Sequence, residues 1–121
     1  MSDCITTFFE AWGIDDEELR LAKINSAVTE NIQYDDPRTP DSLNSIEVLS
    51  NYVAMFSENA PGWLAKVVKA DTIAGITRVT VAFEGVGPDG SQQVQFGQYF
   101  VEKDGDLVSR MVGFVGTGEL D

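Results

Sequence analysis

The chain has 121 residues, 43% of them hydrophobic, which suits one folded domain with one core. Its 20 acidic and 8 basic residues give a formal net charge of −12, which disfavours binding to nucleic acid or to an anionic membrane surface. Histidine is absent, so the sequence excludes Ser-His-Asp and Cys-His catalysis and leaves zinc of the usual type without enough ligands.

The remaining composition concerns the cellular compartment. Cys4 is the only cysteine, so no internal disulfide is possible and a reducing compartment is expected. The N-terminus lacks the basic start and apolar core of a signal peptide, and no apolar run approaches the roughly 20 residues that span a bilayer. We expect a cytoplasmic protein with no metal and no cofactor.

The first predicted helix covers residues 2–12. Its apolar side chains recur at intervals of three and four, which is the pattern of an amphipathic helix: Ile5, Phe8, Phe9 and Trp12. Such an aromatic stripe is typical of a core, although Phe8, Phe9 or Trp12 can also form one wall of a cavity.

A second helix is predicted after the acidic run 15–18. Asp15 suits the N-cap and Glu18 completes a capping box, and this interpretation is favoured over a metal site. A short strand then runs from about Asn31 to Tyr34. Pro37 ends the strand and holds Asp36 in extended geometry at its exit, where a helix-covered sheet can open into a pocket.

A third helix begins at the capping box 44–47, where Asn44 is the expected cap. Beyond Gly62 the hydrophobic period changes to two, which predicts four strands at 63–72, 75–84, 92–102 and 107–115. Helices gathered before a meander predict an α+β fold. The expected architecture is a single domain, 1–121, in which a cone-shaped, curved antiparallel sheet wraps around three N-terminal helices.

This order of elements resembles the nuclear transport factor 2-like superfamily, a cystatin-like fold that includes SnoaL-like and ketosteroid isomerase-like proteins. The residues that carry the resemblance are Ile32-Gln33-Tyr34-Asp35-Asp36-Pro37, the capped helix from Asn44, and the closing Val101-Glu102-Lys103-Asp104-Gly105-Asp106-Leu107-Val108. The resemblance implies a SnoaL-like domain, a deep small-molecule pocket and a homodimer.

The resemblance also implies roles for single residues. Asp36 stands where ketosteroid isomerases carry their general base. The family's oxyanion hole uses a tyrosine on the first helix and a protonated aspartate on the penultimate strand, where this chain has Phe8 or Phe9 and Gln98. Only one of the three catalytic groups is present in this chain, so the resemblance does not imply steroid isomerisation itself.

Strand alternation predicts the pocket walls. If Gln98 faces inward, Phe96 and Phe100 do too, and Tyr99 faces away. The apolar residues around Arg110 on the last strand place its guanidinium inside as well. Its expected partner is Asp36, an acidic group of a ligand, or a group at the rim or dimer interface.

Two classes of function follow from these predictions. The first is a non-catalytic domain that binds a small apolar or acidic ligand, with a site formed by Asp36, Gln98, Arg110, Tyr34, Trp12, Trp63, Phe96 and Phe100. The alternative is an isomerase, dehydratase or cyclase in which Asp36 is the general base on a carbonyl-containing substrate.

Overall fold

The computed structural model describes residues 3–116. The helical elements are α1 (Cys4–Glu10), a short 3₁₀ turn η1 (Ala11–Gly13), α2 (Glu17–Ala27) and α3 (Ile46–Asn59). The strands are β1 (Val28–Asp35), β2 (Leu64–Ile73), β3 (Ile76–Val86), β4 (Gln92–Asp104) and β5 (Leu107–Val115). Among the described residues, no helix is long and apolar enough to cross a membrane.

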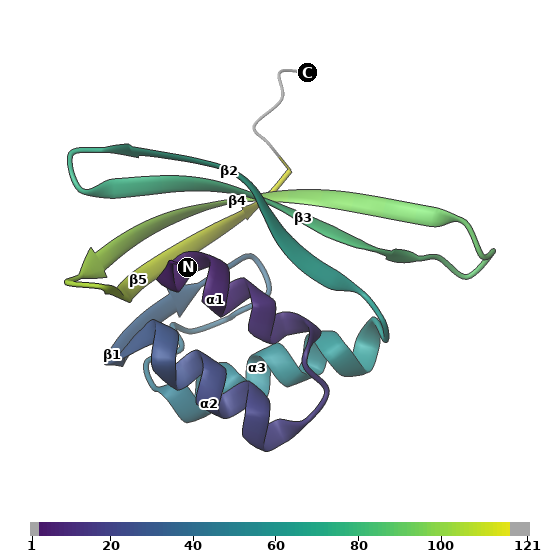
Figure 1. The fold of residues 1–121 in the computed structure, drawn as a ribbon, viewed down its shortest axis with the longest axis horizontal. Helices are drawn as coiled ribbons and strands as arrows, with labels where there is room; N and C mark the ends of the chain where they lie inside the picture. The colour runs from purple at the N-terminus through teal and green to yellow at the C-terminus, as the bar shows by residue number, and fades with distance from the viewer. Residues whose placement is uncertain (1–2, 117–121) are drawn as a thin grey trace.

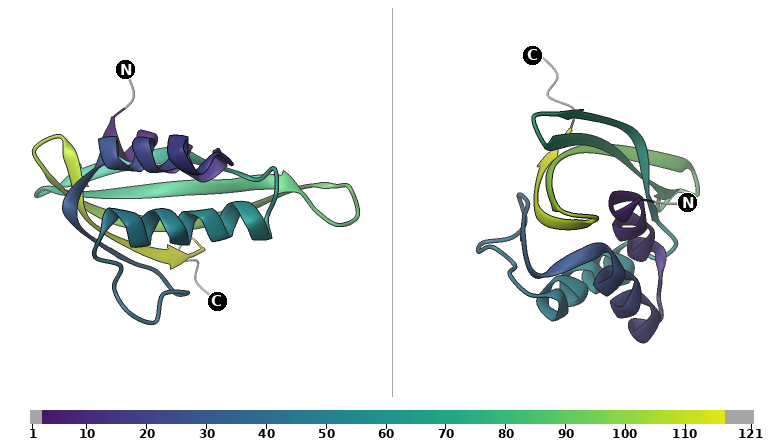
Figure 2. Two further views of the ribbon diagram at one scale, coloured as in Figure 1. Left: turned by 90° about the horizontal axis from the view of Figure 1, so that it is seen from below. Right: turned by 60° about the vertical axis from the view of Figure 1, so that its left-hand side comes forward.

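The five strands form one open sheet in the order β1-β5-β4-β3-β2. Strands β2 to β5 are the predicted antiparallel meander, while β1 pairs in parallel with β5, so the sheet is mixed. Figure 1 shows strands β2 to β5 above the helices and β1 beside them, and Figure 2 shows the sheet curling over the helices. The predicted α+β fold, a curved sheet around three helices, is therefore confirmed.

The core lies between the helices and the concave face of the sheet. The predicted stripe of the first helix is buried, with Phe8 and Phe9 each 1% exposed and Trp12 4% exposed. Phe9 packs edge-on against Tyr99 of β4, with ring centroids 4.9 Å apart. This contact joins the N-terminal helix to the centre of the sheet.

The alternation along β4 is the reverse of the prediction. Gly97, Tyr99 and Val101 face the helices and are buried, whereas Gln98 and Phe100 lie on the outer face of the sheet. Apolar side chains occupy both faces of this strand, so hydrophobicity alone does not identify the inner one. The prediction chose the outer face.

The last strand, β5, contains a bulge that the sequence does not predict. The register steps from Glu102 opposite Arg110 to Lys103 opposite Val108, which leaves one extra residue in β5. Such a bulge reverses the facing of the side chains that follow it. Val108 and Met111 are consequently both buried, although they are three residues apart, and Arg110 points outward.

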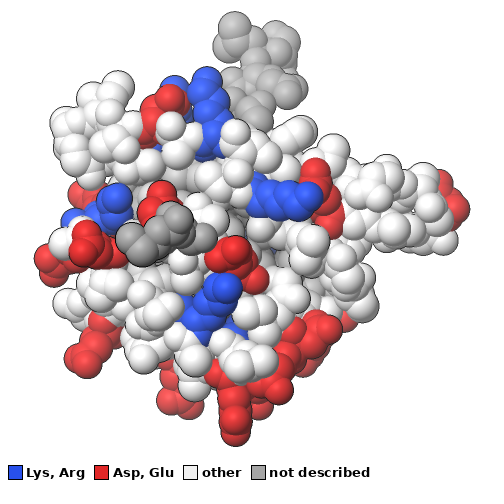
Figure 3. All heavy atoms as spheres, in the orientation of Figure 1, with Lys and Arg blue, Asp and Glu red and all other residues white. Residues whose placement is uncertain are grey.

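The charges are spread unevenly over the molecule. Acidic side chains gather along the lower edge in Figure 3, over the helices, while most of the Lys and Arg in that view lie toward the sheet. The outer face of the sheet carries three ion pairs: Lys66–Glu84 at 2.9 Å, Arg78–Asp71 at 2.8 Å and Arg110–Glu102 at 3.7 Å. This face is therefore locally close to neutral in a chain of net charge −12.

Both predicted helix caps are shifted by one residue. The N-cap of α2 is Asp16, which accepts from the Leu19 backbone N–H at 2.9 Å, and not Asp15. Likewise, the N-cap of α3 is Ser45, and not Asn44. In each case two adjacent residues are good caps, so the sequence does not choose between them.

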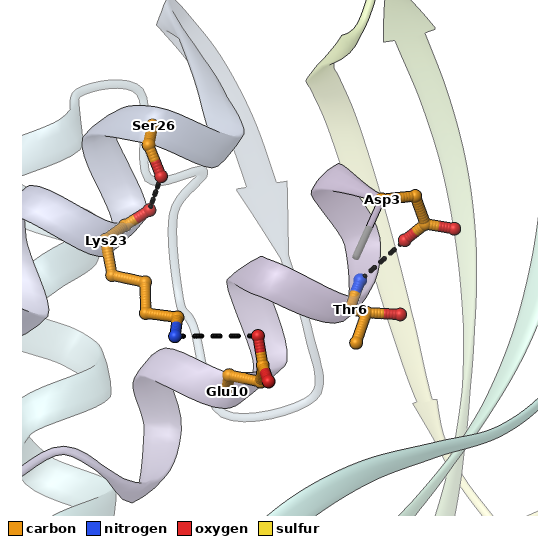
Figure 4. A network of polar contacts seen from close by, with 5 residues as sticks. All are labelled: Asp3, Thr6, Glu10, Lys23 and Ser26. Atoms are coloured by element: carbon orange, nitrogen blue, oxygen red, sulfur yellow. Dashed lines mark hydrogen bonds and ion pairs between the residues drawn. The ribbon is translucent and has the colours of Figure 1, made fainter. Parts of the chain in front are cut away.

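Polar contacts cap the first helix and connect it to the second. Figure 4 shows Asp3 accepting from the Thr6 backbone N–H at 2.8 Å, which caps α1. It also shows Lys23 of α2 paired with Glu10 of α1 at 3.5 Å.

Within residues 3–116, no group of three or more His, Cys, Asp or Glu residues is placed to hold a metal.

Candidate ligand-binding pocket

A cavity of about 730 Å³ lies between helix α3, the loop after β1 and the inner face of the sheet. Its lining is mostly aromatic and comes from six separate parts of the chain: Trp12, Tyr52, Phe56, Trp63, Phe83, Phe96, Tyr99 and Phe114. Of these, Phe96 and Phe114 border the cavity from strand positions that face the outer side of the sheet. The charged residues that line it are Asp36 and Arg38. A largely apolar hollow with a few polar groups is the usual form of a small-molecule site.

The carboxylate of Asp36 is held by three hydrogen bonds. The Tyr34 hydroxyl donates to its Oδ2 at 2.8 Å and the Tyr52 hydroxyl donates to the same oxygen at 2.5 Å. The backbone N–H of Arg38 donates to Oδ1 at 2.8 Å. An oxygen of a carboxylate accepts about two hydrogen bonds, so Oδ2 is saturated and Oδ1 keeps one position for a ligand.

Local sequence explains why Asp36 is fixed there. Tyr34 is fully buried in β1, and its backbone exchanges two hydrogen bonds of 2.9 Å with Leu43. After the strand, the Asp36 backbone N–H donates to the Thr39 hydroxyl at 3.1 Å while its side chain accepts from Arg38. The turn at Asp36 and the backbone pairing of Tyr34 with Leu43 together anchor the loop that presents the carboxylate.

Three tyrosines surround this carboxylate, and they are all the tyrosines of the chain. Burial raises the pKa of Tyr34 well above its usual range, and nearby Tyr99 and Asp36 raise it further. Burial, the hydrogen bond to Asp36 and its charge likewise raise the pKa of Tyr52. Burial also raises the pKa of Tyr99. The hydroxyls therefore stay protonated and remain hydrogen-bond donors at neutral pH.

Two glycines on the inner face keep the hollow open. Gly97 and Gly113 lie on neighbouring strands and both line the cavity. A Cβ at Gly113 would stand 2.5 Å from the Tyr99 ring, so the ring occupies the space that a side chain would need. Glycine at this position lets Tyr99 lie flat against the sheet beside Asp36.

Five of the predicted site residues are brought together. Asp36, Trp12 and Trp63 line the cavity, and Phe96 borders it although it shares the outer face of β4 with Phe100. Tyr34 is buried and does not line the cavity itself, but its hydroxyl donates a hydrogen bond to Asp36. Their binding of a ligand stays a prediction.

Three predicted residues lie elsewhere. Gln98 and Phe100 are on the outer face of β4, and Phe100 stacks edge-on with Phe114 at a centroid distance of 5.7 Å. Arg110 is on the outer face of β5, beside Glu102 and more than half exposed. The predicted position of Arg110 inside the pocket is therefore wrong, and with it the alternative in which Arg110 pairs with Asp36 there, because the β5 bulge turns the guanidinium out.

The sequence reading missed Tyr52, Tyr99, Phe56 and Phe83 as cavity residues. Tyr52 and Phe56 are four apart on α3, so they share one face of the helix. Tyr99 and Phe83 follow from the alternation of the buried valines Val79, Val81 and Val101. That row of β-branched residues is the signal that identifies the inner face.

Solved structures of similar shape identify the fold. A proposed isomerase of the SnoaL-like family from Agrobacterium tumefaciens strain C58 gives a TM-score of 0.78 at 22% identity, covering 94% of this chain and 95% of that one. A proposed SnoaL-like polyketide cyclase from Jannaschia sp. CCS1 gives 0.72 at 17% identity, covering 91% and 80%. A nuclear transport factor 2-like protein of unknown function from Exiguobacterium sp. 255-15 gives 0.72 at 12% identity, covering 96% and 99%.

Comparison by sequence gives no such likeness. No protein-family model matches the sequence, and no curated protein matches it. The predicted fold is confirmed by shape alone, and this fold is shared by proteins with different activities. The function therefore has to be argued from the pocket.

Proposed function

From the nuclear transport factor 2-like fold of this chain, we propose that it is a small-molecule-binding domain whose ligand occupies the cavity beside Asp36. The observation that carries the proposal is a hollow of about 730 Å³ into which a hydrogen-bonded carboxylate projects. This volume is within the range of about 300–1,000 Å³ that is typical of small-molecule sites.

The walls determine how such a ligand is held. Aromatic rings supply most of the contact, so an apolar body is bound by removal of its surface from water. Asp36 Oδ1 accepts one hydrogen bond from the ligand, and the side chains of Asn59 and Gln95 add polar contacts at other points of the lining. The ligand is therefore an apolar molecule with a polar end.

The tryptophans provide the experiment. Both tryptophans of the chain, Trp12 and Trp63, line the cavity, so intrinsic fluorescence reports its occupation. Titration with small aromatic compounds should change the emission and raise the melting temperature. In Ala60→Phe the added ring fills part of the cavity, and both effects should weaken. Ile73→Phe, at an 80% exposed position on β2, is the matched control and should bind as the parent does. Identical titrations of parent and Ala60→Phe would contradict the proposal.

A second candidate function is catalysis, with Asp36 as general base on a carbonyl-containing substrate in an isomerase, dehydratase or cyclase. The observation that favours it is the pair of protonated tyrosines at the cavity wall, Tyr52 and Tyr99. The Tyr52 hydroxyl already donates its one proton to Asp36, so Tyr99 is the group that is able to donate to the oxyanion that forms when a proton leaves the carbon beside a carbonyl. Tyr99 supplies a donor inside the cavity, where Phe8 has none and Gln98 faces outward.

The catalytic candidate has its own test. A β,γ-unsaturated cyclic ketone becomes a conjugated enone when a base moves its α-proton, and the product is followed by its ultraviolet absorbance. Loss of the base in Asp36→Asn should lower turnover by at least about 100-fold while the fold is kept. Turnover unchanged in that variant would contradict a role for Asp36 as base.

We also propose that two copies associate through the outer face of the sheet. Apolar side chains cluster there on β4 and β5: Val94, Phe96, Phe100, Val112 and Phe114, of which Phe114 is 55% exposed. A second copy is the favoured occupant because two chains of net charge −12 repel each other on their helical sides. The nearly neutral outer face is where they can meet with least repulsion.

A further inference from the structure

The positions of Arg110 and Asp36 bear on the charge of the ligand. The sequence predicts an apolar or acidic ligand, and the acidic option depends on Arg110 inside the pocket, but Arg110 lies on the outer face beside Glu102. Asp36 is then the charged group that the structure holds in place within the lining. We infer that the cavity takes a hydrophobic organic cation, an ammonium group carrying an apolar body, with its positive centre beside Asp36. This inference rests on the proposed ligand-binding function.

The geometry of the Asp36 carboxylate favours a ligand that donates a hydrogen bond. Tyr34 and Tyr52 fill the acceptor positions of Oδ2, and the Arg38 N–H fills one position of Oδ1. What remains is an acceptor, and an acceptor binds a donor. An ammonium N–H completes it with a charge-assisted hydrogen bond, whereas a ligand carboxylate would meet a like charge.

The aromatic composition of the cavity walls also favours a cation. Aromatic rings present a negative face and attract cations that lie over them. Trp12, Phe56 and Phe83 form a mutually packed group in the lining, with centroids 5.2 to 5.8 Å apart. Such rings receive the apolar substituents of the ligand and also favour its positive charge. A neutral ligand gains only the apolar contact with these rings.

Arg38 is the group that opposes a cation, and its influence is the weaker one. Its side chain is exposed at the cavity edge, where water screens it, while Asp36 is partly buried and fixed by two tyrosines. At Tyr52 and at Tyr99 the negative charge of Asp36 raises the pKa more than the positive charge of Arg38 lowers it. At these two hydroxyls, which are part of the site, the effect of Asp36 is therefore larger than the opposing effect of Arg38.

The whole chain adds a longer-range effect. A net charge of −12 attracts cations toward the surface and repels anions, which raises the rate of encounter for a cationic ligand. Added salt reduces this contribution. The local and the overall fields thus favour the same sign of ligand.

The test uses three probes of one size that differ in charge at neutral pH. These are 3-phenylpropylamine, a cation, 3-phenylpropan-1-ol, which is neutral, and 3-phenylpropanoate, an anion. Binding to the full chain is measured by calorimetry and by tryptophan fluorescence. The amine should bind about tenfold more tightly than the alcohol, and the anion should be the weakest of the three. An alcohol that equals the amine, or an anion that exceeds it, overturns the inference.

Two variants separate the roles of the charges. Asp36→Asn keeps the side-chain shape and should remove the preference of the amine over the alcohol while the alcohol still binds. Arg38→Gln should leave the order of the three probes unchanged and strengthen the amine slightly. An amine preference that survives in Asp36→Asn overturns the inference. Circular dichroism and the melting temperature show that both variants are folded.

The proposed function and the inference fail in different ways. If none of the three probes binds the parent chain, the cavity does not take ligands of this size, and both are rejected. If the probes bind without the cation preference, small-molecule binding stands and only the charge assignment is rejected.

Discussion

The hydroxyl of Tyr52 on α3 lies 2.5 Å from Oδ2 of Asp36, and this contact joins the helix to the loop after β1. Sixteen residues separate the two in sequence. The same oxygen accepts from Tyr34 at 2.8 Å, from the buried side. The carboxylate is therefore held between a buried and a half-exposed donor, and the two contacts should differ in their contribution to stability.

Replacement of either tyrosine by phenylalanine removes one of these hydrogen bonds. Tyr34→Phe should lower the free energy of unfolding by about 2 kcal/mol, because the donor is buried and its acceptor is a carboxylate. Tyr52→Phe should cost about 1 kcal/mol, since water can replace a half-exposed hydroxyl. Urea denaturation of both variants measures the difference. A larger loss in Tyr52→Phe would contradict this ranking.

Gly113→Ala should destabilise the chain and disturb the pocket. The new Cβ would lie 2.5 Å from the ring of Tyr99, and relief of such a clash in a packed core costs about 1–3 kcal/mol. Gly97→Ala is the matched control on the neighbouring strand, where the nearest atom to the added Cβ is the Phe114 carbonyl oxygen at 3.1 Å. It should cost less. Thermal unfolding of the two variants gives the comparison, and equal losses would contradict the role of Tyr99.

Alkaline conditions should unfold the protein in a way that the tyrosines report. Above the ordinary tyrosine pKa of 10.0 the unfolded chain loses phenolic protons, while Tyr34 and Tyr99 keep theirs in the folded state because burial raises their pKa. The unfolded state then binds fewer protons, so stability falls as pH rises, by about 1.4 kcal/mol per pH unit for each such tyrosine. Below pH 10 this stability is fully present.

The measurement is tyrosinate absorbance during an alkaline titration, alongside far-ultraviolet circular dichroism. Tyrosinate should appear together with the loss of structure and not before it. A gradual ionisation near the ordinary pKa in the folded protein would contradict the burial of these hydroxyls.

The oligomeric state should depend on the outer face of the sheet. Phe100→Glu places a charge in the middle of the apolar cluster, and sedimentation equilibrium should show the dimer weakened or lost. Leu19→Glu is the control, because Leu19 is 63% exposed on α2, away from that face. A parent chain that stays monomeric would contradict the proposed association.

The sequence was sufficient for the fold because its strongest signals are local. Helical periodicity, the Pro37 stop and the glycine-rich turns establish the order of elements, and that order leaves few architectures. The parallel pairing of β1 with β5 was not predicted, because it joins Val28 to Val108 across most of the chain. Nothing in a short window of sequence records such a contact.

The pocket was predicted less well, for a physical reason on β4. This strand has Phe96 and Phe100 on one face and Tyr99 and Val101 on the other, so its alternation is ambiguous. Asp36 was found because its turn chemistry is local. Arg110 was placed wrongly because a bulge is a property of two paired strands and leaves no mark in either alone.

The partner of β1 in the sheet also bears on how the chain folds. The strand at residues 28–35 has its only described sheet neighbour in the strand at residues 107–115. During synthesis, the N-terminal helices and the first strand emerge without the surface that covers them, and they must wait for nearly the whole chain. Such distant pairing lengthens the search for the native state, so folding should be slow for a domain of this size and should be completed only after the strand at residues 107–115 has emerged.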